Sequence, residues 1–274
     1  MANKAILLAL FSIVLEVLPV QPWVHPSRAD ERGIPILAYH RFNPVPADSM
    51  TVTTHVFESH LKHLQENGCR AVPLGDLLEV YLKKGIPPDS RLVAITADDA
   101  HISVYTTALP LVKKYRIPMT LFVYPSAVSN ASYAMTWDQL RELKATGLFD
   151  FQSHTYWHPN FNQEKKRLAP ADFEKLVDMQ FRKSKAKLEK ELQVRINMLA
   201  WPFGIHDPWL MHKAAEAGYA AAFTIEGYAC SKEAHPMALP RYLMADTDRG
   251  KAFERILQGS ISAGKKGNGN GKKG

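Results

Sequence analysis

The chain has 274 residues and a formal net charge of +7, and 46% of its residues are hydrophobic, an ordinary share for a globular protein. Four lysines lie in residues 264–274, which leaves +3 elsewhere (7 minus 4) and no basic stripe, so nucleic-acid binding is not indicated. The only cysteines, Cys69 and Cys230, form no Cys-x-x-Cys motif, which excludes a thiolate metal site and leaves a disulfide between them open.

The N-terminus resembles a targeting segment. Lys4 precedes an apolar stretch at 5–20, and Ser27 and Ala29 are small residues suitably placed for cleavage after Ala29. Glu16 interrupts the apolar stretch, so an uncleaved membrane anchor stays open as the alternative. Either interpretation of 1–29 predicts an exported protein that is periplasmic, secreted or anchored facing outside, with membrane contact only through that anchor.

Strand-like and helical segments alternate along residues 33–258, which we take as one domain. The predicted strands or extended segments are 34–39, 69–72, 91–97, 119–123, 149–153, 198–201, 220–224 and 239–243. The predicted helices are 55–67, 74–84, 105–115, 136–147, 170–192, 208–217 and 249–257. A Gly- and Lys-rich tail at 259–274 is expected to be disordered.

This alternation predicts an α/β fold in which crossover connections join parallel strands. A count of seven or eight strands favours a closed or nearly closed barrel, in which functional groups gather at the C-terminal strand ends. The candidate groups follow strand-like runs in this way: His40, Asp98 with Asp99, His154, and residues 202–204. We therefore expect them to share one site.

Two of these elements provide the ligands for a metal. Asp99, His154 and His158 can supply one carboxylate and two imidazoles to a divalent ion and leave a position open for water. Such an ion lowers the pKa of bound water towards about 7. Asp98 ends the same strand as Asp99 and is the candidate general base, a role that typically contributes about 10²- to 10⁴-fold. This inventory suits metal-assisted hydrolysis.

Each element alone has a simpler explanation. Two adjacent acids at a strand end also suit a turn and a helix cap, and histidines four residues apart are common on protein surfaces. Their occurrence together, after successive strand-like segments, favours a site.

Four motifs resemble the polysaccharide deacetylases of carbohydrate esterase family 4, the nodulation-type deacetylases. Residues 96–100 (Thr-Ala-Asp-Asp-Ala) are similar to that family's Thr-Phe-Asp-Asp-Gly motif, and 153–158 (Ser-His-Thr-Tyr-Trp-His) to its His-Ser/Thr-x-x-His motif. Residues 200–204 (Ala-Trp-Pro-Phe-Gly) resemble its Arg-x-Pro-Tyr-Gly motif. The opening at 36–40 (Ile-Leu-Ala-Tyr-His) resembles the branch that includes poly-N-acetylglucosamine deacetylases.

The resemblance implies a distorted (β/α) barrel that removes acetyl groups from N-acetylated sugars. It implies one divalent metal ion, for which we expect Zn²⁺, with Co²⁺, Ni²⁺ or Fe²⁺ as alternatives. It also implies that the Phe203 backbone N–H donates to the developing oxyanion. The aromatic rings of Trp201 and Phe203 lie near this motif and are candidates for contact with sugar rings.

The chain also departs from the family pattern. Ala100 replaces the usual glycine, where a positive φ or close approach is wanted. The arginine of the third motif is absent, and Arg241 is the candidate to replace it in orienting Asp98. The family's late Leu-x-His motif, which carries the general acid, is also missing. His40 is our candidate for that acid, with His235 as the alternative.

The sequence predicts a metal-dependent hydrolase that removes N-acetyl groups from an N-acetylglucosamine-type polysaccharide or oligosaccharide outside the cytoplasm. Two alternatives keep the same site: an esterase for O-acetyl xylan, and a catalytically degenerate barrel that only binds glycans. A non-haem iron oxygenase also uses two histidines and one carboxylate. The spare carboxylate of Asp98 argues against that last class, because oxygen activation has no need of it.

Overall fold

The structure is a computed structural model that describes residues 33–79 and 91–259. The signal peptide or anchor expected at 1–29 and residues 260–274 of the expected tail lie outside these ranges. Within them, no helix combines the length and apolar character needed to cross a membrane.

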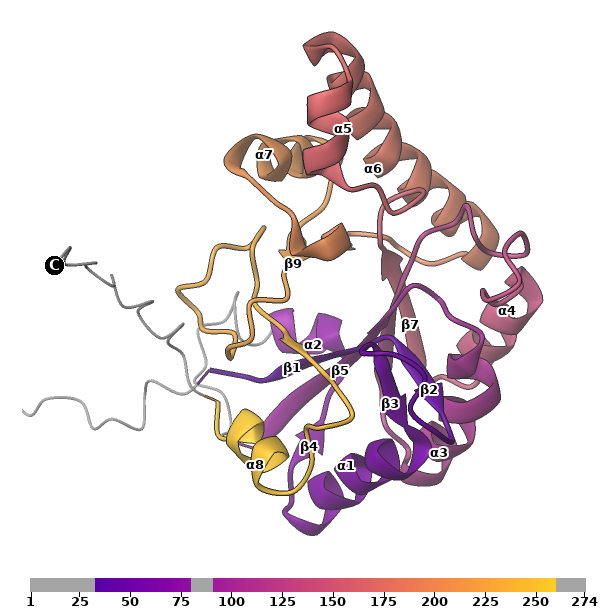
Figure 1. Cartoon of the computed structure of the whole chain (residues 1–274), viewed down its shortest axis with the longest axis vertical. Helices are drawn as coiled ribbons and strands as arrows, with labels where there is room; N and C mark the ends of the chain where they lie inside the picture. The colour runs from indigo at the N-terminus through magenta and orange to yellow at the C-terminus, as the bar shows by residue number, and fades with distance from the viewer. Residues whose placement is uncertain (1–32, 80–90, 260–274) are drawn as a thin grey trace, which may run out of the picture. The chain divides into compact units, whose positions relative to one another are not determined.

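Seven parallel strands form one curled sheet in the order β10-β1-β5-β6-β7-β8-β9 (Figure 1). Their bounds are β1 (Ile36–Tyr39), β5 (Leu92–Asp98), β6 (Met119–Val123), β7 (Phe149–Ser153), β8 (Met198–Ala200), β9 (Ala221–Phe223) and β10 (Tyr242–Leu243). A parallel bridge between Phe223, in β9, and Leu239, shortly before β10, links the two edges of the sheet. An additional short strand, β4 (Arg70–Ala71), pairs with β5. The predicted distorted barrel of seven or eight parallel strands is confirmed.

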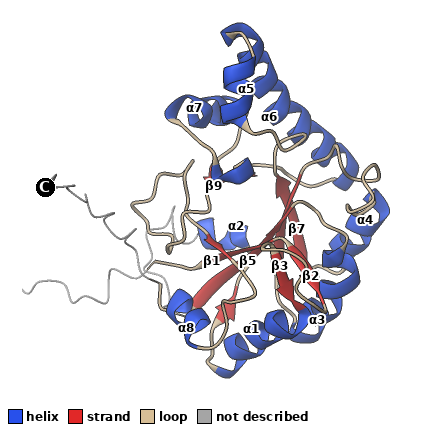
Figure 2. Cartoon of the chain, in the orientation of Figure 1, coloured by secondary structure: helices blue, strands red, loops and turns tan. Residues whose placement is uncertain are grey.

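Helices surround the sheet (Figure 2). They are α1 (Thr54–Glu66), α2 (Leu74–Leu78), η3 (Val104–Ala108), α3 (Leu109–Tyr115), α4 (Trp137–Ala145), α5 (Phe161–Arg167), α6 (Pro170–Leu192), η4 (Pro202–Gly204), α7 (Pro208–Glu216) and α8 (Lys251–Leu257). Their ends follow local chemistry. Thr136 and Gln139 form a capping box at the start of α4, and Gln193 in the left-handed conformation ends α6.

Some elements differ from the sequence prediction. The predicted helix 74–84 is helical at its described residues, 74–79, and the remainder of that prediction lies outside the described ranges. The loop predicted after β1 contains two short parallel strands, β2 (Arg41–Asn43) and β3 (Thr51–Thr53), and α5 was not predicted. Strands of three residues are too short to show a hydrophobic period.

The strands are buried on both faces, and alternate residues separate into two clusters. Ile36, Ala94 and Phe122 belong to the cluster inside the barrel, together with Phe223 and Leu239. The residues between them pack outward against the helices and include Leu37, Ile95, Leu121, Leu199 and Trp201. This alternation determines which side chains at the strand ends point into the barrel.

Candidate active site

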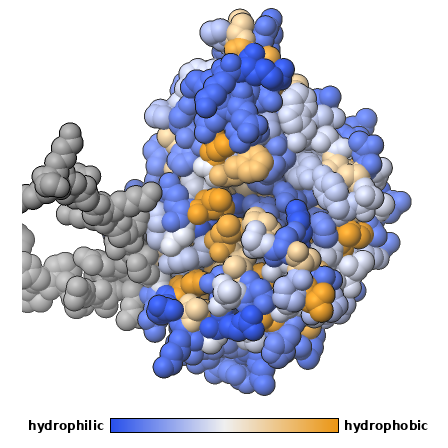
Figure 3. All heavy atoms as spheres, viewed as in Figure 1, coloured by the Kyte–Doolittle hydropathy of each residue, from blue (hydrophilic) through white to orange (hydrophobic). Residues whose placement is uncertain are grey.

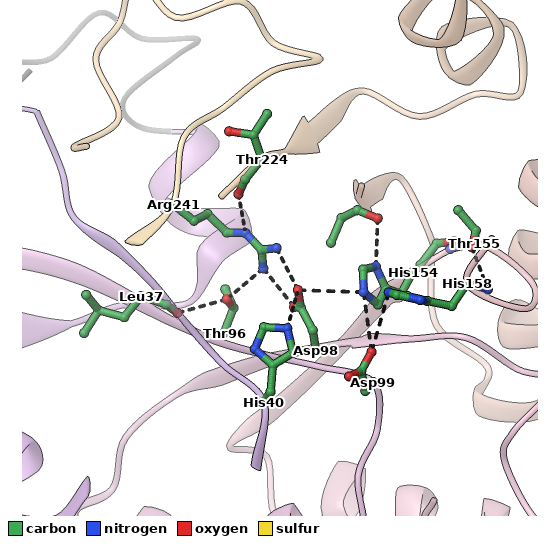
Figure 4. Close-up of polar contacts among 12 residues, drawn as sticks. Leu37, His40, Thr96, Asp98, Asp99, His154, Thr155, His158, Thr224 and Arg241 are labelled. Atoms are coloured by element: carbon green, nitrogen blue, oxygen red, sulfur yellow. Dashed lines mark hydrogen bonds and ion pairs between the residues drawn. The ribbon is translucent and has the colours of Figure 1, made fainter. Parts of the chain in front are cut away.

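Four predicted site residues lie at or just beside strand ends, at positions where the alternation along the strand points their side chains into the barrel. His40 is two residues beyond Ala38, Asp98 is two beyond Thr96, and Arg241 is two beyond the inner-cluster residue Leu239. His154 follows β7, and all four side chains are buried. Figure 4 shows them converging with Asp99 and His158. The structure therefore brings together residues that are spread over some 200 positions of the sequence, at one end of the barrel.

The three candidate metal ligands lie within reach of one another. The Asp99 Oδ1 atom is 3.6 Å from His154 Nε2 and 3.8 Å from His158 Nε2. One ligand atom from each residue can be chosen so that all lie within 4.8 Å of one another. A tetrahedral zinc with bonds of about 2.0 Å separates its ligand atoms by about 3.3 Å, so only small side-chain adjustments are needed. The donor set and its spacing fit a divalent ion.

Hydrogen bonding fixes the His154 ring in the form that a metal requires. The Nδ1 atom lies 2.8 Å from the carbonyl of Ala200, which can only accept, so Nδ1 carries the hydrogen and Nε2 keeps its lone pair. Burial, reinforced by the neighbouring His158, lowers the pKa of His154 to about 3. Burial also lowers the pKa of His158 and raises the pKa of Asp99. Both rings are thus neutral and available as ligands near neutral pH.

The backbone at these residues is in the left-handed region. Positive φ angles occur at Asp99 (72°), Ala100 (53°), Thr155 (64°) and His158 (61°). The two histidines therefore lie on a loop rather than on a helical face, and Thr155 Oγ1 accepts from the His158 N–H at 3.1 Å to hold that loop. The positive φ of Ala100 is the conformation for which the family's glycine is suited. Such positions cost roughly 1 kcal/mol or more for a residue with a Cβ.

Asp98 is held by a buried two-pronged ion pair. Arg241 Nη1 and Nη2 donate to the two carboxylate oxygens at 2.8 and 2.7 Å. The guanidinium also donates to Thr96 Oγ1 and to the Thr224 carbonyl, both at 3.1 Å. Burial alone would raise the pKa of Asp98, but Arg241 and then His154 outweigh it and hold the pKa below its ordinary value. Arg241 thus lies where the sequence analysis expected a guanidinium that orients Asp98.

His40 also lies beside Asp98. Its Nε2 atom is 3.9 Å from Asp98 Oδ2, and its buried Nδ1 atom has no hydrogen-bond partner. Burial lowers the pKa of His40, although the Asp98 charge acts in the opposite direction, so the resting ring is neutral. The alternative candidate, His235, accepts from the Met237 N–H at 3.1 Å and is not among the residues that line the cavity.

The third motif places its two aromatic residues differently. Phe203 is 58% exposed, has a φ of 57°, and packs edge-on against the His158 ring at 4.6 Å. Its N–H belongs to the first residues of a single 3₁₀ turn, which have no carbonyl within the turn to donate to. Trp201 was the other candidate for sugar contact, but its side chain is 1% exposed and its indole N–H donates to the Met237 carbonyl. Trp201 directly follows β8 on the same outward-facing side as Leu199 and packs against Phe181 of α6, so it supports the cavity wall and offers no sugar platform.

Comparison with known proteins agrees with this geometry. A family model for polysaccharide deacetylase matches residues 85–222, half of the chain. The chain belongs to the polysaccharide deacetylase family. The family resemblance that the sequence indicated is thereby confirmed, and with it the hydrolase class. The matched residues include Asp98, Asp99, His154 and His158 but not His40 or Arg241.

Relatives of this family extend the match. A poly-beta-1,6-N-acetyl-D-glucosamine N-deacetylase of Staphylococcus aureus is 28% identical over 212 residues, which cover 76% of this chain and 71% of the relative. The structure of IcaB from Ammonifex degensii is 28% identical, with a TM-score of 0.70 over 83% of this chain and 97% of that one. Streptococcus pyogenes deacetylase PplD, solved with acetate, shares the fold with a TM-score of 0.74 at 23% identity, over 82% of this chain and 98% of that one.

Sequence reasoning missed one side of the deacetylase cavity. The cavity has a volume of about 760 Å³, and beyond the expected residues it is lined by Arg41, Met50, His101, Tyr124, Tyr133, Ile225 and Leu243. Tyr124 directly follows β6, so the strand-end rule that selected Asp98 and His154 applied to it equally. Tyr133 carries no such signal, because it lies in a loop nine residues further on.

Proposed function

We propose that this protein is a metal-dependent hydrolase that removes N-acetyl groups from an N-acetylglucosamine-type polysaccharide or oligosaccharide outside the cytoplasm. The observation that carries the proposal is that a candidate metal-ligand set and a fixed carboxylate lie side by side in one cavity. The ligand atoms of Asp99, His154 and His158 lie close enough together to hold one metal ion. Beside them, Asp98 is an ionised carboxylate that Arg241 holds in place. The names of the S. aureus relative and of IcaB support the choice of substrate class.

The residues fit a resident divalent ion. One carboxylate oxygen and two neutral imidazole nitrogens face a common point, and the second nitrogen of His154 is committed to the Ala200 carbonyl. This mixture of nitrogen and oxygen donors suits Zn²⁺, with Co²⁺, Ni²⁺ or Fe²⁺ as alternatives. When bound, such an ion would supply an acidified water and polarise the acetyl carbonyl.

Asp98 is the proposed general base. Its lowered pKa keeps it ionised across the physiological range, and its hydrogen bonds to Arg241 aim the carboxylate into the cavity. His154 Nε2 lies 3.9 Å from Asp98 Oδ2, so the base lies next to the ligand set. Proton removal at this position is expected to contribute about 10²- to 10⁴-fold to the rate.

Two further groups complete the proposed reaction. The Phe203 N–H donates to the oxyanion that develops on the acetyl group, a contribution of about 10²- to 10³-fold where such donors have been removed from other enzymes. His40 delivers a proton to the leaving amine. Because its resting ring is neutral, His40 must first gain that proton, and Asp98 at 3.9 Å is the group placed to pass it on.

Export is the remaining part of the proposal. It is supported by the apolar stretch and the small residues before Ala29, with either a cleaved signal peptide or a retained anchor at 1–29. Mass determination of the mature N-terminus after expression with the native leader distinguishes the two forms.

Acetate release from defined N-acetylglucosamine oligomers and from O-acetyl xylan tests the function. We expect release from the oligomers that Asp98→Asn abolishes and that a chelator suppresses. Release only from xylan would replace the proposal with an esterase that uses the same residues. Oligomer binding without any acetate release, by a metal-loaded sample, would indicate a glycan-binding barrel.

A further inference from the structure

The loop that carries the two candidate histidine ligands is held in its middle by one side chain of α6. We call residues 154–158 the histidine loop. The N–H groups of Tyr156 and Trp157, in the middle of this loop, both donate to Gln180 Oε1, each at 3.0 Å. Because both partners are donors, the amide oxygen, and not the amide nitrogen, must lie at this position. A single side chain thus holds two consecutive peptide groups between the two histidines.

The other N–H groups of the histidine loop have acceptors in the loop itself or in the adjacent strands. Their three acceptors are the Val123 carbonyl, Ser153 Oγ and Thr155 Oγ1. All five N–H groups of the loop are therefore paired, as native backbone requires away from water. Gln180 supplies the partner for the two that the neighbouring chain does not reach.

Gln180 lies in an otherwise apolar stripe of α6. The buried face of this helix has two polar members, Gln180 and Ser184, among the apolar residues Phe173, Leu176, Val177, Phe181, Leu188 and Leu192. Gln180 is 0% exposed, whereas Figure 3 shows the surface over α5 and α6 as largely hydrophilic. Buried polar side chains are found where they have hydrogen-bond partners. The amide nitrogen of Gln180 contacts the Met179 sulfur at 4.0 Å, so the strong interactions of this side chain are those of its oxygen with the histidine loop.

A second contact of α6 fixes the strand end before the loop. Ser184 lies one turn after Gln180, and its Oγ atom is 2.8 Å from Ser153 Oγ. The Tyr219 hydroxyl lies at the same distance from Ser153 Oγ. The helix thereby contacts both the last residue of β7 and the middle of the histidine loop, from the side opposite to the cavity.

The two histidines are secured in different ways. His154 is bonded through its ring to the Ala200 carbonyl. His158 lies at the end of the histidine loop with a φ of 61°, and its N–H is bonded within the loop. On a helix, residues four apart are held on one face by the helix itself. Here the position of His158 relative to His154 depends on the shape of the loop.

We infer that Gln180 is a positioning residue for the candidate metal site, because its amide oxygen holds the histidine loop in the shape that brings His158 to His154 and Asp99. This inference rests on the metal dependence in the proposed function. Groups that orient metal ligands from behind typically contribute about 10- to 100-fold to metal affinity. Loss of the Gln180 oxygen should therefore weaken metal binding through His158 and leave His154 in place.

Zinc affinity, measured by competition with a chromophoric chelator, tests this inference without turnover. Gln180→Met keeps the length of the side chain and removes the oxygen. We expect it to raise the zinc dissociation constant by about 10- to 100-fold. Gln180→Glu keeps an acceptor for both N–H groups and should recover most of the wild-type affinity.

Gln152→Met is the matched control. Gln152 Oε1 also accepts from two consecutive N–H groups, those of Asn197 at 3.1 Å and Met198 at 2.9 Å, and Gln152 does not line the cavity. Its replacement should lower the urea midpoint as much as Gln180→Met does and leave the zinc affinity unchanged. The pair thus separates a general loss of stability from a loss of positioning.

Adding Gln180→Met to His158→Ala shows whether the two residues act together. If Gln180 acts through His158, the double variant should bind zinc as weakly as His158→Ala alone. Losses that add in full, an unchanged affinity for Gln180→Met, or an equal loss for Gln152→Met would overturn the inference. If Gln180→Met does not fold, Gln180→Asn, whose shorter side chain withdraws the oxygen, takes its place with the same expectations. A wild type that takes up no zinc would instead contradict the metal dependence of the proposed function.

Discussion

The two adjacent aspartates of the site are held in different ways. Asp98 is almost fully buried and receives two direct hydrogen bonds from Arg241, which comes from the segment that closes the barrel. Asp99 has a side chain that is 19% exposed, and backbone at positive φ brings it towards His154 and His158. The proposed base is thus positioned by hydrogen bonds that the protein itself completes, whereas the candidate ligands present lone pairs that a cation would complete. The difference separates a side chain that the fold holds alone from three side chains that we propose to hold a metal.

Removal of Arg241, which breaks its ion pair with Asp98, should have the largest effect on stability and activity. Arg241→Met leaves a buried, unpaired carboxylate, so we expect the free energy of unfolding to fall by about 3–5 kcal/mol. Acetate release should fall by at least about 10²-fold, because the pKa of Asp98 rises and its aim is lost. Urea unfolding and an acetate assay measure the two effects.

The double variant Asp98→Asn, Arg241→Met is the control for this change. It removes the unpaired charge and should recover much of the stability but none of the activity. If Arg241→Met were as stable as the wild type, the ion pair would not be what holds Asp98.

Zinc bound at Asp99, His154 and His158 should stabilise the folded protein. At a free concentration about 100 times its dissociation constant, a bound ion adds about 2.7 kcal/mol to the free energy of unfolding. We expect thermal unfolding to show this increase for the wild type and for Asp98→Asn, and to show little of it for His158→Ala. His212→Ala, on the exposed side of α7, is the matched control and should respond like the wild type. Equal stabilisation of His158→Ala would remove His158 from the ligand set.

Mild acid should weaken the helical layer while Asp98 stays ionised. His60 is buried between Tyr39 and Phe253, and burial lowers its pKa from 6.5 to about 4. The unfolded chain therefore binds the extra proton in this window. The contribution of His60 to stability is complete above about 6.5 and is lost as the pH falls towards about 4. We expect a loss of about 2 kcal/mol between pH 7 and pH 5.

The lowered pKa of Asp98 keeps its ion pair with Arg241 intact over the same range. Urea unfolding as a function of pH measures the loss. His60→Gln, which has no proton to gain, should give a flatter profile. A profile as steep as that of the wild type would assign the pH dependence to other groups.

The smallest effect concerns the strained backbone beside Asp99. Ala100→Gly relieves the positive φ but removes a buried methyl group and adds freedom to the unfolded chain. These terms nearly cancel, so we expect the free energy of unfolding to change by less than about 1 kcal/mol. Ala100→Val, with a branched side chain at the same φ, should destabilise clearly. If both variants unfold alike, the backbone at Ala100 is not constrained as the structure has it.

Much of the fold follows from hydrophobic periodicity. The predicted bounds of β6, β7 and α6 match the structure, because long apolar stripes and prolines mark them. Strands β2 and β3 were missed because three residues show no period, and their pairing depends on contacts made only in the folded chain. The strand-end rule found Asp98, His40 and His154, although it was not applied to Tyr124.

The site was less predictable where orientation matters. Arg241 reaches Asp98 because its segment bridges β9 and β1, a closure that sequence spacing does not specify. Trp201 was a candidate for sugar contact, although it directly follows β8 on the outward-facing side. Alternation from Leu199 would have assigned it to the packed face against the helices.

The most direct test of the central claim is acetate release from N-acetylglucosamine trimer by wild type and Asp98→Asn, before chelation, after it, and after zinc is restored. We predict that the wild type loses activity with the chelator and regains it with zinc. Asp98→Asn should take up zinc and remain inactive throughout. Activity that persists in the chelated wild type, or in Asp98→Asn, would contradict a hydrolase in which a cation and a neighbouring carboxylate act together.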